Sequence, residues 1–221
     1  MERLSLDTPI PEVLRGAVIA LGNFDGFHRG HQAVVGRAIQ RAFHERKPAI
    51  VATFDPHPVR FFKPDLPPFR LTSLDQREEL FGHAGADAML VFGFDAKLAA
   101  TSAEAFVALL AERLHAGGIV TGEDFTFGKG RAGNVATLAQ LAADRGIAAE
   151  TVGAVSDGKA RISSGAIREA LAAGELAAAT RLLTRPFAIA GIVEHGDKRG
   201  RGLGYPTANI RLGDYQRPRY G

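Results

Sequence analysis

The stretch from Val18 to His31, VIALGNFDGFHRGH, restricts the fold of this 221-residue chain more than any other. Its apolar start is typical of a buried parallel strand, and the glycines, Asn and Asp that follow favour a turn. After His31, apolar residues recur every three or four positions, as on one face of a helix, and a second apolar run occupies 49–54. The pattern predicts strand, turn, helix and strand. The free N–H groups of such a helix N-terminus attract phosphate.

Two histidines stand where this helix is expected to begin. His28 and His31 are three positions apart, so both imidazoles lie on one face of the first turn and can donate hydrogen bonds to a polyphosphate. Gly30 between them allows a nucleotide to approach the backbone closely. The stretch has no Walker lysine, and its glycine spacing differs from GxGxxG. The alternative is an ordinary helix start, but a pair after a strand and turn favours phosphate ligands.

Residues 22–31, GNFDGFHRGH, resemble the HxGH signature of the nucleotidylyltransferase superfamily. The Asn-Phe-Asp-Gly before the histidines and Gln32 after them resemble, more specifically, the FAD synthetase module of bacterial bifunctional riboflavin kinase/FAD synthetases. The resemblance implies a Rossmann-like fold and adenylyl-transfer chemistry.

Strand and helix patterns alternate along most of the chain. Capping boxes at Ser73 and Thr101 predict two helices, the second ended by Gly117 and Gly118, and 134–145 predicts another. The expected strands are 18–21, 49–54, 88–94, 119–122 and 147–152. This alternation predicts an α/β fold with a doubly wound parallel sheet covered on both faces.

Ligands of such sheets bind outside the carboxyl ends of the strands. We therefore expect three loops, 22–31, 55–70 and 122–131, to converge on one site. In the last of them Phe125 and Phe127 offer planar apolar surface and Asp124 a polar group, although both rings could instead fill the core below. The resembled family usually carries an Arg between the two phenylalanines. Thr126 stands there, so that role does not carry over.

The proline-rich stretch after the second strand, Asp55-Pro56-His57-Pro58, predicts an extended turn, continued as an irregular aromatic loop. It resembles the family's flavin-side loop. Pro56 and Pro58 give a rigid wall, and Phe62 can stack on a flat heterocycle. The alternative is a crossover loop packed on the sheet. We interpret His57 as a loop residue rather than a general base.

A second polar group of residues is Ile162-Ser163-Ser164-Gly165-Ala166-Ile167-Arg168. Ser163 or Ser164 is a natural N-cap of a helix that runs to about 173, and Arg168 lies one turn in. Hydroxyls, a helix N-terminus and a guanidinium together can hold polyphosphate, although such capping is often only structural. The stretch resembles the family's second nucleotide signature, with Gly165 in place of the usual hydroxyl residue.

Composition excludes some classes of protein. The absence of cysteine excludes disulfides and thiolate metal sites, and the N-terminal residues do not resemble a secretory signal. No apolar run is long enough for a membrane span, so we expect a cytoplasmic protein. Seven of the basic residues lie in 185–221 against three acidic ones. They are interleaved with glycines, so a polyphosphate explains them as well as nucleic acid does, and we expect no nucleic-acid partner.

The C-terminal part predicts a different kind of structure. Residues 187–196 read as a strand, and 200–210, GRGLGYPTANI, resemble the start of a riboflavin kinase barrel, which implies an Mg-ATP role for Thr207 and Asn209. The 37 residues from Arg185 cannot bury a core of their own. We expect an adenylyltransferase domain over 1–184 and, over 185–221, an incomplete β-barrel segment without kinase activity.

The resemblance implies an FMN adenylyltransferase that joins FMN to the AMP of ATP, with Mg²⁺ carried by the phosphates and no dedicated protein metal site. The implied catalytic residues are His28, His31 and Arg168. Those for ATP are Gly22, Asn23, Phe24, Asp25, Gly30, Ser163 and Ser164. Those for the flavin are Pro56, Pro58, Phe62, Asp124, Phe125 and Phe127. Three alternatives stay open: an adenylyltransferase for a non-flavin phosphate, a non-catalytic flavin or nucleotide carrier, and an active kinase. Homo-oligomerisation is also left open.

Overall fold

The computed structural model describes residues 1–158, 160–194, 204–205 and 207–219. Its centre is a parallel six-stranded sheet in the order β1-β4-β3-β2-β5-β6. The strands are β1 Glu2–Ser5, β2 Val18–Leu21, β3 Ala49–Asp55, β4 Ala88–Gly93, β5 Gly118–Gly122 and β6 Ala148–Val152. The predicted doubly wound, Rossmann-like sheet is confirmed.

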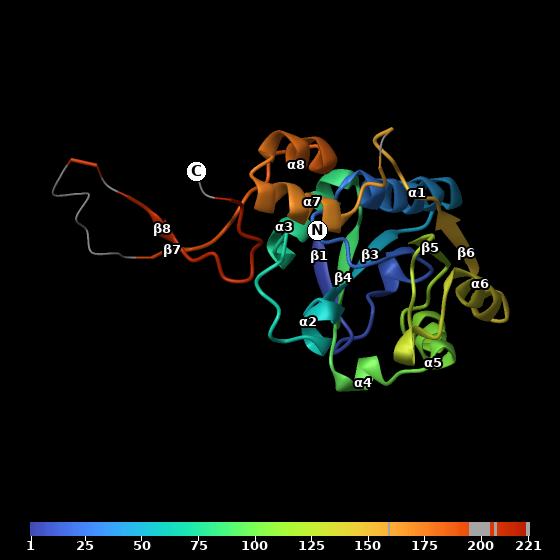
Figure 1. Cartoon of the computed structure of the whole chain (residues 1–221). Coiled ribbons are helices and arrows are strands. Elements are labelled where there is room, and N and C mark those ends of the chain that lie inside the picture. The colour runs from blue at the N-terminus through green and yellow to red at the C-terminus, as the bar shows by residue number, and fades with distance from the viewer. Residues whose placement is uncertain (159, 195–203, 206, 220–221) are drawn as a thin grey trace.

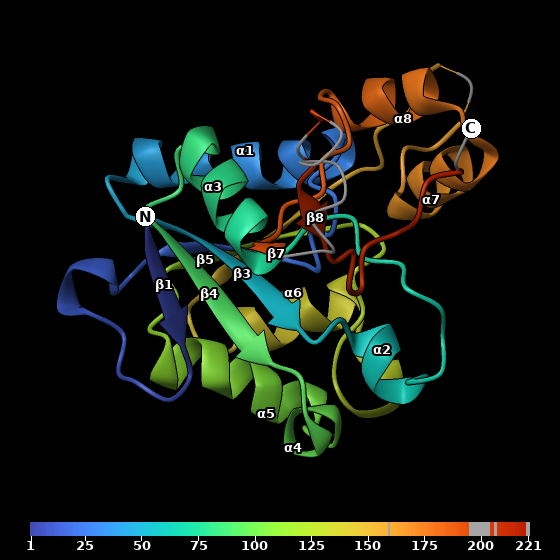
Figure 2. The same cartoon turned by 90° about the vertical axis from the view of Figure 1, so that its left-hand side faces the viewer.

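Helices cover both faces of this sheet (Figures 1 and 2). One face carries α1 (Arg29–Glu45) and α3 (Leu74–Ala84). The other carries α5 (Ala103–Ala108) and α6 (Val135–Ala143). Alternate residues of β2 enter the two cores: Ile19 and Leu21 pack with α5 and α6, and Val18 and Ala20 pack with α1. A strand buried on both faces must be apolar throughout, which explains the run VIAL.

The order of the strands fixes where a ligand can bind. From β2 the chain proceeds outward through β3 to β4, and later returns to the other side of β2 with β5. Between β2 and β5 the two connecting loops leave the sheet in opposite directions and open a crevice at its carboxyl edge. The loop before α1 and the loop after β5 flank this crevice.

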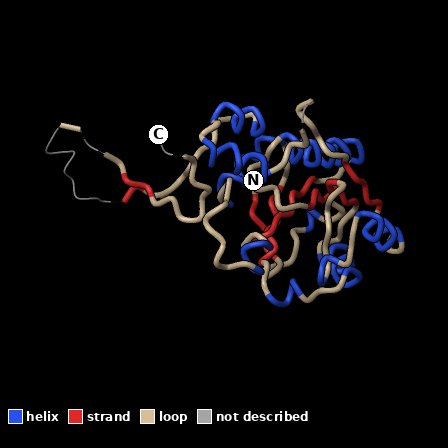
Figure 3. Tube along the Cα trace, in the orientation of Figure 1, coloured by secondary structure: helices blue, strands red, loops and turns tan. Residues whose placement is uncertain are grey.

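Two further helices and a short β ribbon complete the described chain. α7 (Ser164–Ala173) and α8 (Leu176–Leu183) form a third apolar cluster around Leu71. β7 (Val193–Glu194) pairs antiparallel with β8 (Asn209–Ile210), and this ribbon projects from the body (Figures 1 and 3). Among the described residues, each helix is too short or too polar to cross a bilayer.

Several sequence predictions need correction. Glu2–Ser5 was not predicted as a strand, but β1 pairs with β4 at one sheet edge, where Leu4 alone is buried. The prediction of an irregular aromatic loop after β3 is wrong in part, because Pro58 begins a short helix, α2 (Pro58–Phe62). Proline suits the first position of a helix.

The strand predicted over 187–196 is present only at Val193–Glu194 within the described residues. Upstream of it, backbone groups are taken by side chains: Ala188 O accepts from Gln76, and Ala190 N donates to Tyr215. These bonds replace the ladder that a strand would need. The glycine-rich part of the kinase-like motif, 200–203, lies outside the described residues.

The helix predicted from a capping box at Thr101 has Ser102 as its N-cap instead, and it ends before Gly117. α5 passes into a π-helical turn, Leu109–Arg113, and His115 reverses the chain at a φ of 49°. Gly117 serves another purpose, because a Cβ there would lie 2.1 Å from the carbonyl oxygen of Gly16. A short helix, α4 (Ala96–Ala99), precedes α5.

Candidate active site

A cavity of about 670 Å³ lies at the carboxyl edge of the sheet, at the predicted crevice. The three loops expected to converge all contribute to it, together with 152–155 and the start of α7. Of the residues assigned from the sequence, those that line it are Asn23, Phe24, Asp25, His28, Gly30, His31, Pro58, Phe62, Asp124, Phe125, Phe127, Ser163, Ser164 and Arg168. Gly22 and Pro56 do not, and neither do Thr207 and Asn209, which belong to the projecting ribbon region.

His28 and His31 form one unit at the start of α1. His28 is the N-cap, and its Nδ1 accepts the backbone N–H of His31 at 3.3 Å. The two imidazoles stack at 3.6 Å between ring centroids, and Phe24 contacts His31 edge-on. His31 Nδ1 is buried without a hydrogen-bond partner within the described residues. The predicted pairing of the two rings on one face is therefore confirmed.

Both imidazoles are neutral at neutral pH. Burial lowers the pKa of His28 to about 4 and that of His31 well below its ordinary value. Because Nδ1 of His28 accepts a hydrogen bond, its hydrogen is on Nε2. The pair can therefore offer hydrogen bonds to a ligand without a formal positive charge.

These pKa values predict a loss of stability in acid. Below about pH 6.5 an imidazole in the unfolded chain binds a proton that folded His28, with a pKa of about 4, excludes. The unfolded state then binds more protons, so the free energy of unfolding should fall as the pH falls from 6.5 to 4, by up to about 3 kcal/mol for this residue. Urea unfolding across this range measures it. A flat profile, or the same slope in a His28→Asn variant, would contradict this assignment.

His57 is a site residue that sequence reasoning missed. It caps α2, where its Nδ1 accepts the N–H of Val59 at 3.2 Å, and its ring packs edge-on against Phe69. It lines the cavity, and burial lowers its pKa to about 4. Its Nε2 is therefore a neutral donor. The signal in the sequence was the proline after it, which favours a helix start.

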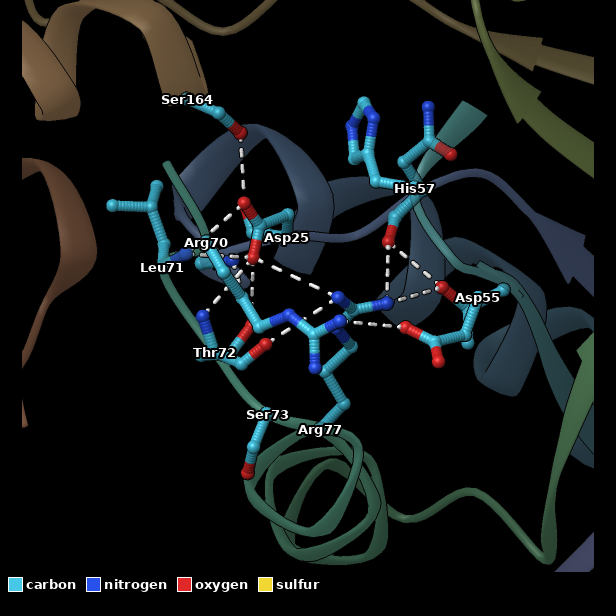
Figure 4. Close-up of polar contacts among 12 residues, drawn as sticks. Asp25, Asp55, His57, Arg70, Leu71, Thr72, Ser73, Arg77 and Ser164 are labelled. Carbon is cyan, nitrogen blue, oxygen red and sulfur yellow. Dashed lines mark hydrogen bonds and ion pairs between the residues drawn. The ribbon is translucent and has the colours of Figure 1, made fainter. Parts of the chain in front are cut away.

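Asp25 is the centre of the polar network (Figure 4). Its side chain is 2% exposed and accepts hydrogen bonds from the N–H groups of Leu71 and Thr72, both at 3.0 Å. Nη2 of Arg168 lies 2.7 Å from Oδ2, and Nη2 of Arg77 lies 3.8 Å from Oδ1. Both carboxylate oxygens are thus engaged by the protein. Asp25 borders the cavity chiefly as an anchor for these groups.

Arg168 is held in a fixed position. Besides Asp25, its Nε donates to the carbonyl oxygen of Phe69 at 2.7 Å, and its guanidinium lies over the Phe69 ring. Its side chain remains 24% exposed at the cavity. A planar guanidinium with remaining donors suits phosphate oxygens.

Arg77, on α3, was also missed. Its side chain is 1% exposed, and it donates to Thr53 Oγ1 at 3.0 Å and to Thr72 O at 3.3 Å. It neighbours Asn23, whose carbonyl oxygen accepts from Thr53 at 2.7 Å. Its pKa is lowered by burial, although Asp25 acts in the opposite direction. Arg77 thus supports the turn between β2 and α1 from below.

The two serines at the start of α7, the N-cap Ser163 and the first helical residue Ser164, have different partners. Ser163 accepts the N–H of Ala166 at 3.2 Å, which is ordinary N-capping. Ser164 Oγ donates to the backbone oxygen of Asp25 at 2.8 Å and so joins α7 to the loop 22–31, which carries the two histidines. A Cβ at Gly165 would meet nothing closer than 3.6 Å, so the space for a hydroxyl residue is open there.

The opposite wall of the cavity is aromatic. Phe127 is buried in the core against Phe106, whereas Phe125 is half-buried and stacks on it at 5.7 Å. Phe62 is 64% exposed and packs against Phe94. The core alternative is therefore confirmed for Phe127, and the role of Phe125 as a wall for an aromatic ligand stays a prediction. Asp124 pairs with Arg161 at 2.7 Å on the exposed rim.

Comparison with known families decides what this arrangement belongs to. Residues 10–166 match the family model described as FAD synthetase, and residues 183–221 match that of riboflavin kinase. The chain belongs to the FAD synthetase family.

Curated relatives agree with this family. The chain is 39% identical over 198 residues to the bifunctional riboflavin kinase/FMN adenylyltransferase of Escherichia coli K12, covering 89% of this chain and 63% of that protein. The enzyme of the same name from Pseudomonas fluorescens is 41% identical over 90% and 64% of the two chains. That from Listeria monocytogenes is 40% identical over 92% and 65%. This chain thus spans somewhat less than two thirds of these relatives.

Solved structures agree on the fold. A Streptococcus pneumoniae crystal structure, described as a macrolide-efflux protein, matches with a TM-score of 0.86 and 30% identity over 100% of this chain and 73% of its own. The pantoate-β-alanine ligase of Francisella tularensis matches with a TM-score of 0.50 and 14% identity over 80% and 77%, which shows the fold alone.

Two positions, 126 and 165, depart from the signatures that the sequence resembles, and only the first of them lies on the cavity wall. Thr126 lines the cavity, and Gly165 lies beside Ser164, where α7 begins.

Proposed function

We propose that this chain transfers the AMP moiety of ATP to FMN, giving FAD and pyrophosphate. The observation that carries the proposal is the stacked, neutral His28–His31 pair at the N-terminus of α1, facing a cavity whose other wall is aromatic. One cavity thus offers donors for a polyphosphate and planar surface for a flavin.

In the proposed reaction a phosphate oxygen of FMN attacks the α-phosphorus of ATP. The bond from that phosphorus to the bridging oxygen breaks, and pyrophosphate leaves with the bond's electrons. No covalent enzyme intermediate is needed. The protein contributes positioning and stabilisation of negative charge.

The roles of individual residues follow from their donors. His28 Nε2 and the free N–H groups of α1 would bind the α- and β-phosphates. Arg168, fixed by Asp25, would face the leaving pyrophosphate. We add His57 to this set, because a neutral donor between the two walls suits the phosphate of FMN. Asn23 and Phe24 would border the adenosine.

The flavin would lie against the exposed aromatic side of the cavity. Pro58, Phe62 and Phe125 present apolar surface there. Phe127 would act from below, through its stacking on Phe125. An isoalloxazine ring is planar and apolar enough to be bound by such a wall.

Mg²⁺ would enter as part of the ATP substrate and help to neutralise the phosphate charge. Over the described residues no three metal-ligating side chains cluster, and the carboxylate of Asp25 is already engaged. Phosphate oxygens and water are the ligands that Mg²⁺ prefers in such sites. The cytoplasmic location, the domain boundary at 184 and the lack of kinase activity stay predictions.

Incubation of the purified chain with Mg-ATP and FMN, and in parallel with riboflavin, tests the proposal. We expect FAD from FMN, resolved by chromatography, and no product from riboflavin. Bound but unconverted FMN would make this chain a flavin carrier. An unchanged FMN spectrum in the presence of the chain, with turnover of another phosphate, would favour a different adenylyltransferase. FMN formed from riboflavin would show an active kinase.

A further inference from the structure

Segment 69–72, which leads from the α2 region into α3, has two bonded sides. On the inner side, Phe69 O accepts from Arg168, and the N–H groups of Leu71 and Thr72 hold Asp25. These backbone groups thus fix an ion pair that borders the cavity. The segment itself belongs to no helix or strand of the body, so that its position depends on what it contacts.

The outer side of the same segment is bonded by the C-terminal part of the chain. Arg70 N donates to Asp214 O at 2.8 Å, and Gln216 N donates to Arg70 O at 2.7 Å. These two bonds form a parallel bridge between Arg70 and Tyr215. The side chain of Arg70 also pairs with Asp55 at the end of β3, at 3.0 Å (Figure 4).

Tyr215 anchors this contact. It is 6% exposed, although it lies far along the chain from the residues that cover it. Its hydroxyl donates at 2.7 Å to Oε1 of Gln76, which also accepts the N–H of Ser73 in the capping box of α3. The phenol thus secures the start of the helix that carries Arg77.

The same C-terminal stretch reaches the helix of Arg168. Arg219 N donates to Leu171 O at 2.8 Å, in the last turn of α7. Residues 214–219 therefore contact the two elements that hold the Asp25–Arg168 pair, one on each side. They lie within 183–221, which matches riboflavin kinase, whereas Asp25 lies within 10–166, which matches FAD synthetase, and Arg168 follows two residues after that region.

We propose that residues 214–219 are a positioning segment of the adenylyl-transfer site, with Tyr215 as its main positioning residue. Through segment 69–72 they hold Asp25, and with it Arg168, in register with the phosphates of ATP. This inference rests on the proposed function for its role in turnover. Its effect on ATP affinity rests on the part of that proposal which places the ATP phosphates beside Arg168.

Tyr215→Ala tests the proposal, with Tyr205→Ala as control because Tyr205 is 79% exposed. We expect Y215A to raise the KM for ATP about ten-fold while kcat and the KM for FMN change by no more than about two-fold. Y215F, which keeps the ring, should recover most of the affinity. If Tyr215 only stabilised the fold, Y215A would lower the active fraction and leave both KM values unchanged, and that result would overturn the proposal.

A second pair of variants tests the backbone bridge if Y215A does not fold. Gln216→Pro removes the N–H that Arg70 O accepts, whereas Gln216→Ala loses the same side chain and keeps that N–H. We expect Q216P to bind ATP at least about five-fold more weakly than Q216A by calorimetry. Equal affinities would overturn the proposal. ATP binding without FAD formation by the unaltered chain would overturn the proposed function alone.

Discussion

Asparagine in place of Asp25 is expected to lower FAD formation about a hundred-fold and the free energy of unfolding by about 3–5 kcal/mol. The side chain is 2% exposed, and its negative charge stands between Arg77, itself 1% exposed, and Arg168. Without that charge Arg77 is a buried cation that has lost its ion-pair partner, and Arg168 loses the group that orients it. Urea unfolding and chromatographic assay of FAD measure the two effects.

Two variants separate the causes. Asp75→Asn removes an exposed carboxylate that is paired with Arg3, so we expect a change below about 1 kcal/mol and unaltered activity. Adding Arg77→Met to D25N removes the unpaired buried cation, which should restore part of the stability but not the activity. An Asp25→Asn protein as stable as the unaltered chain would refute the electrostatic role of this carboxylate.

Asparagine in place of His28 is expected to lower kcat about 10²–10³-fold, with the free energy of unfolding at neutral pH changed by no more than about 1 kcal/mol. Asparagine is a good N-cap, so it can accept the N–H of His31 as the imidazole does. What it lacks is the Nε2 donor, held rigid by the stack on His31. Steady-state kinetics with Mg-ATP and FMN measure the effect.

The comparison with alanine and with a distant histidine makes this test specific. His28→Ala loses both the cap and the donor, so it should lose about 1 kcal/mol more stability than H28N at similar kcat. His83→Asn, on the exposed side of α3, should behave as the unaltered chain. FAD formation at the normal rate by H28N would remove His28 from the proposed mechanism.

The parts of the fold that could be predicted are those whose apolar residues recur with the period of a strand or a helix. Five of the six sheet strands and helices α1, α3, α5 and α6 follow from apolar runs and capping signals. The runs are clearest in β2 to β5, which are buried on both faces, whereas β6 is a largely exposed edge strand. β1 was not predicted because Glu2–Ser5 has one buried side chain and pairs with one neighbouring strand only, so the sequence there has no apolar run. The strand expected from 187 failed because its backbone bonds to Gln76 and Tyr215, and no local pattern contains those partners.

The site divides in the same way. His28 and His31 were predictable because three-residue spacing at a helix start places them together. The role of Asp25 was not, since it bonds to Leu71 and Arg168, which lie 46 and 143 residues further along. Arg77 did carry a local signal: it lies three positions after Leu74 and four before Phe81, on the buried face of α3. A charged residue on such a face usually has a buried partner.

The N-cap bond of His28 has a consequence for how the site responds to acid. An imidazolium has no acceptor nitrogen, so a proton on Nδ1 removes the hydrogen bond that the N–H of His31 donates to that ring. The group that starts the helix and the group that would contact the nucleotide are the same ring. Acid should therefore fray the first turn and release the nucleotide in a single event, not in two.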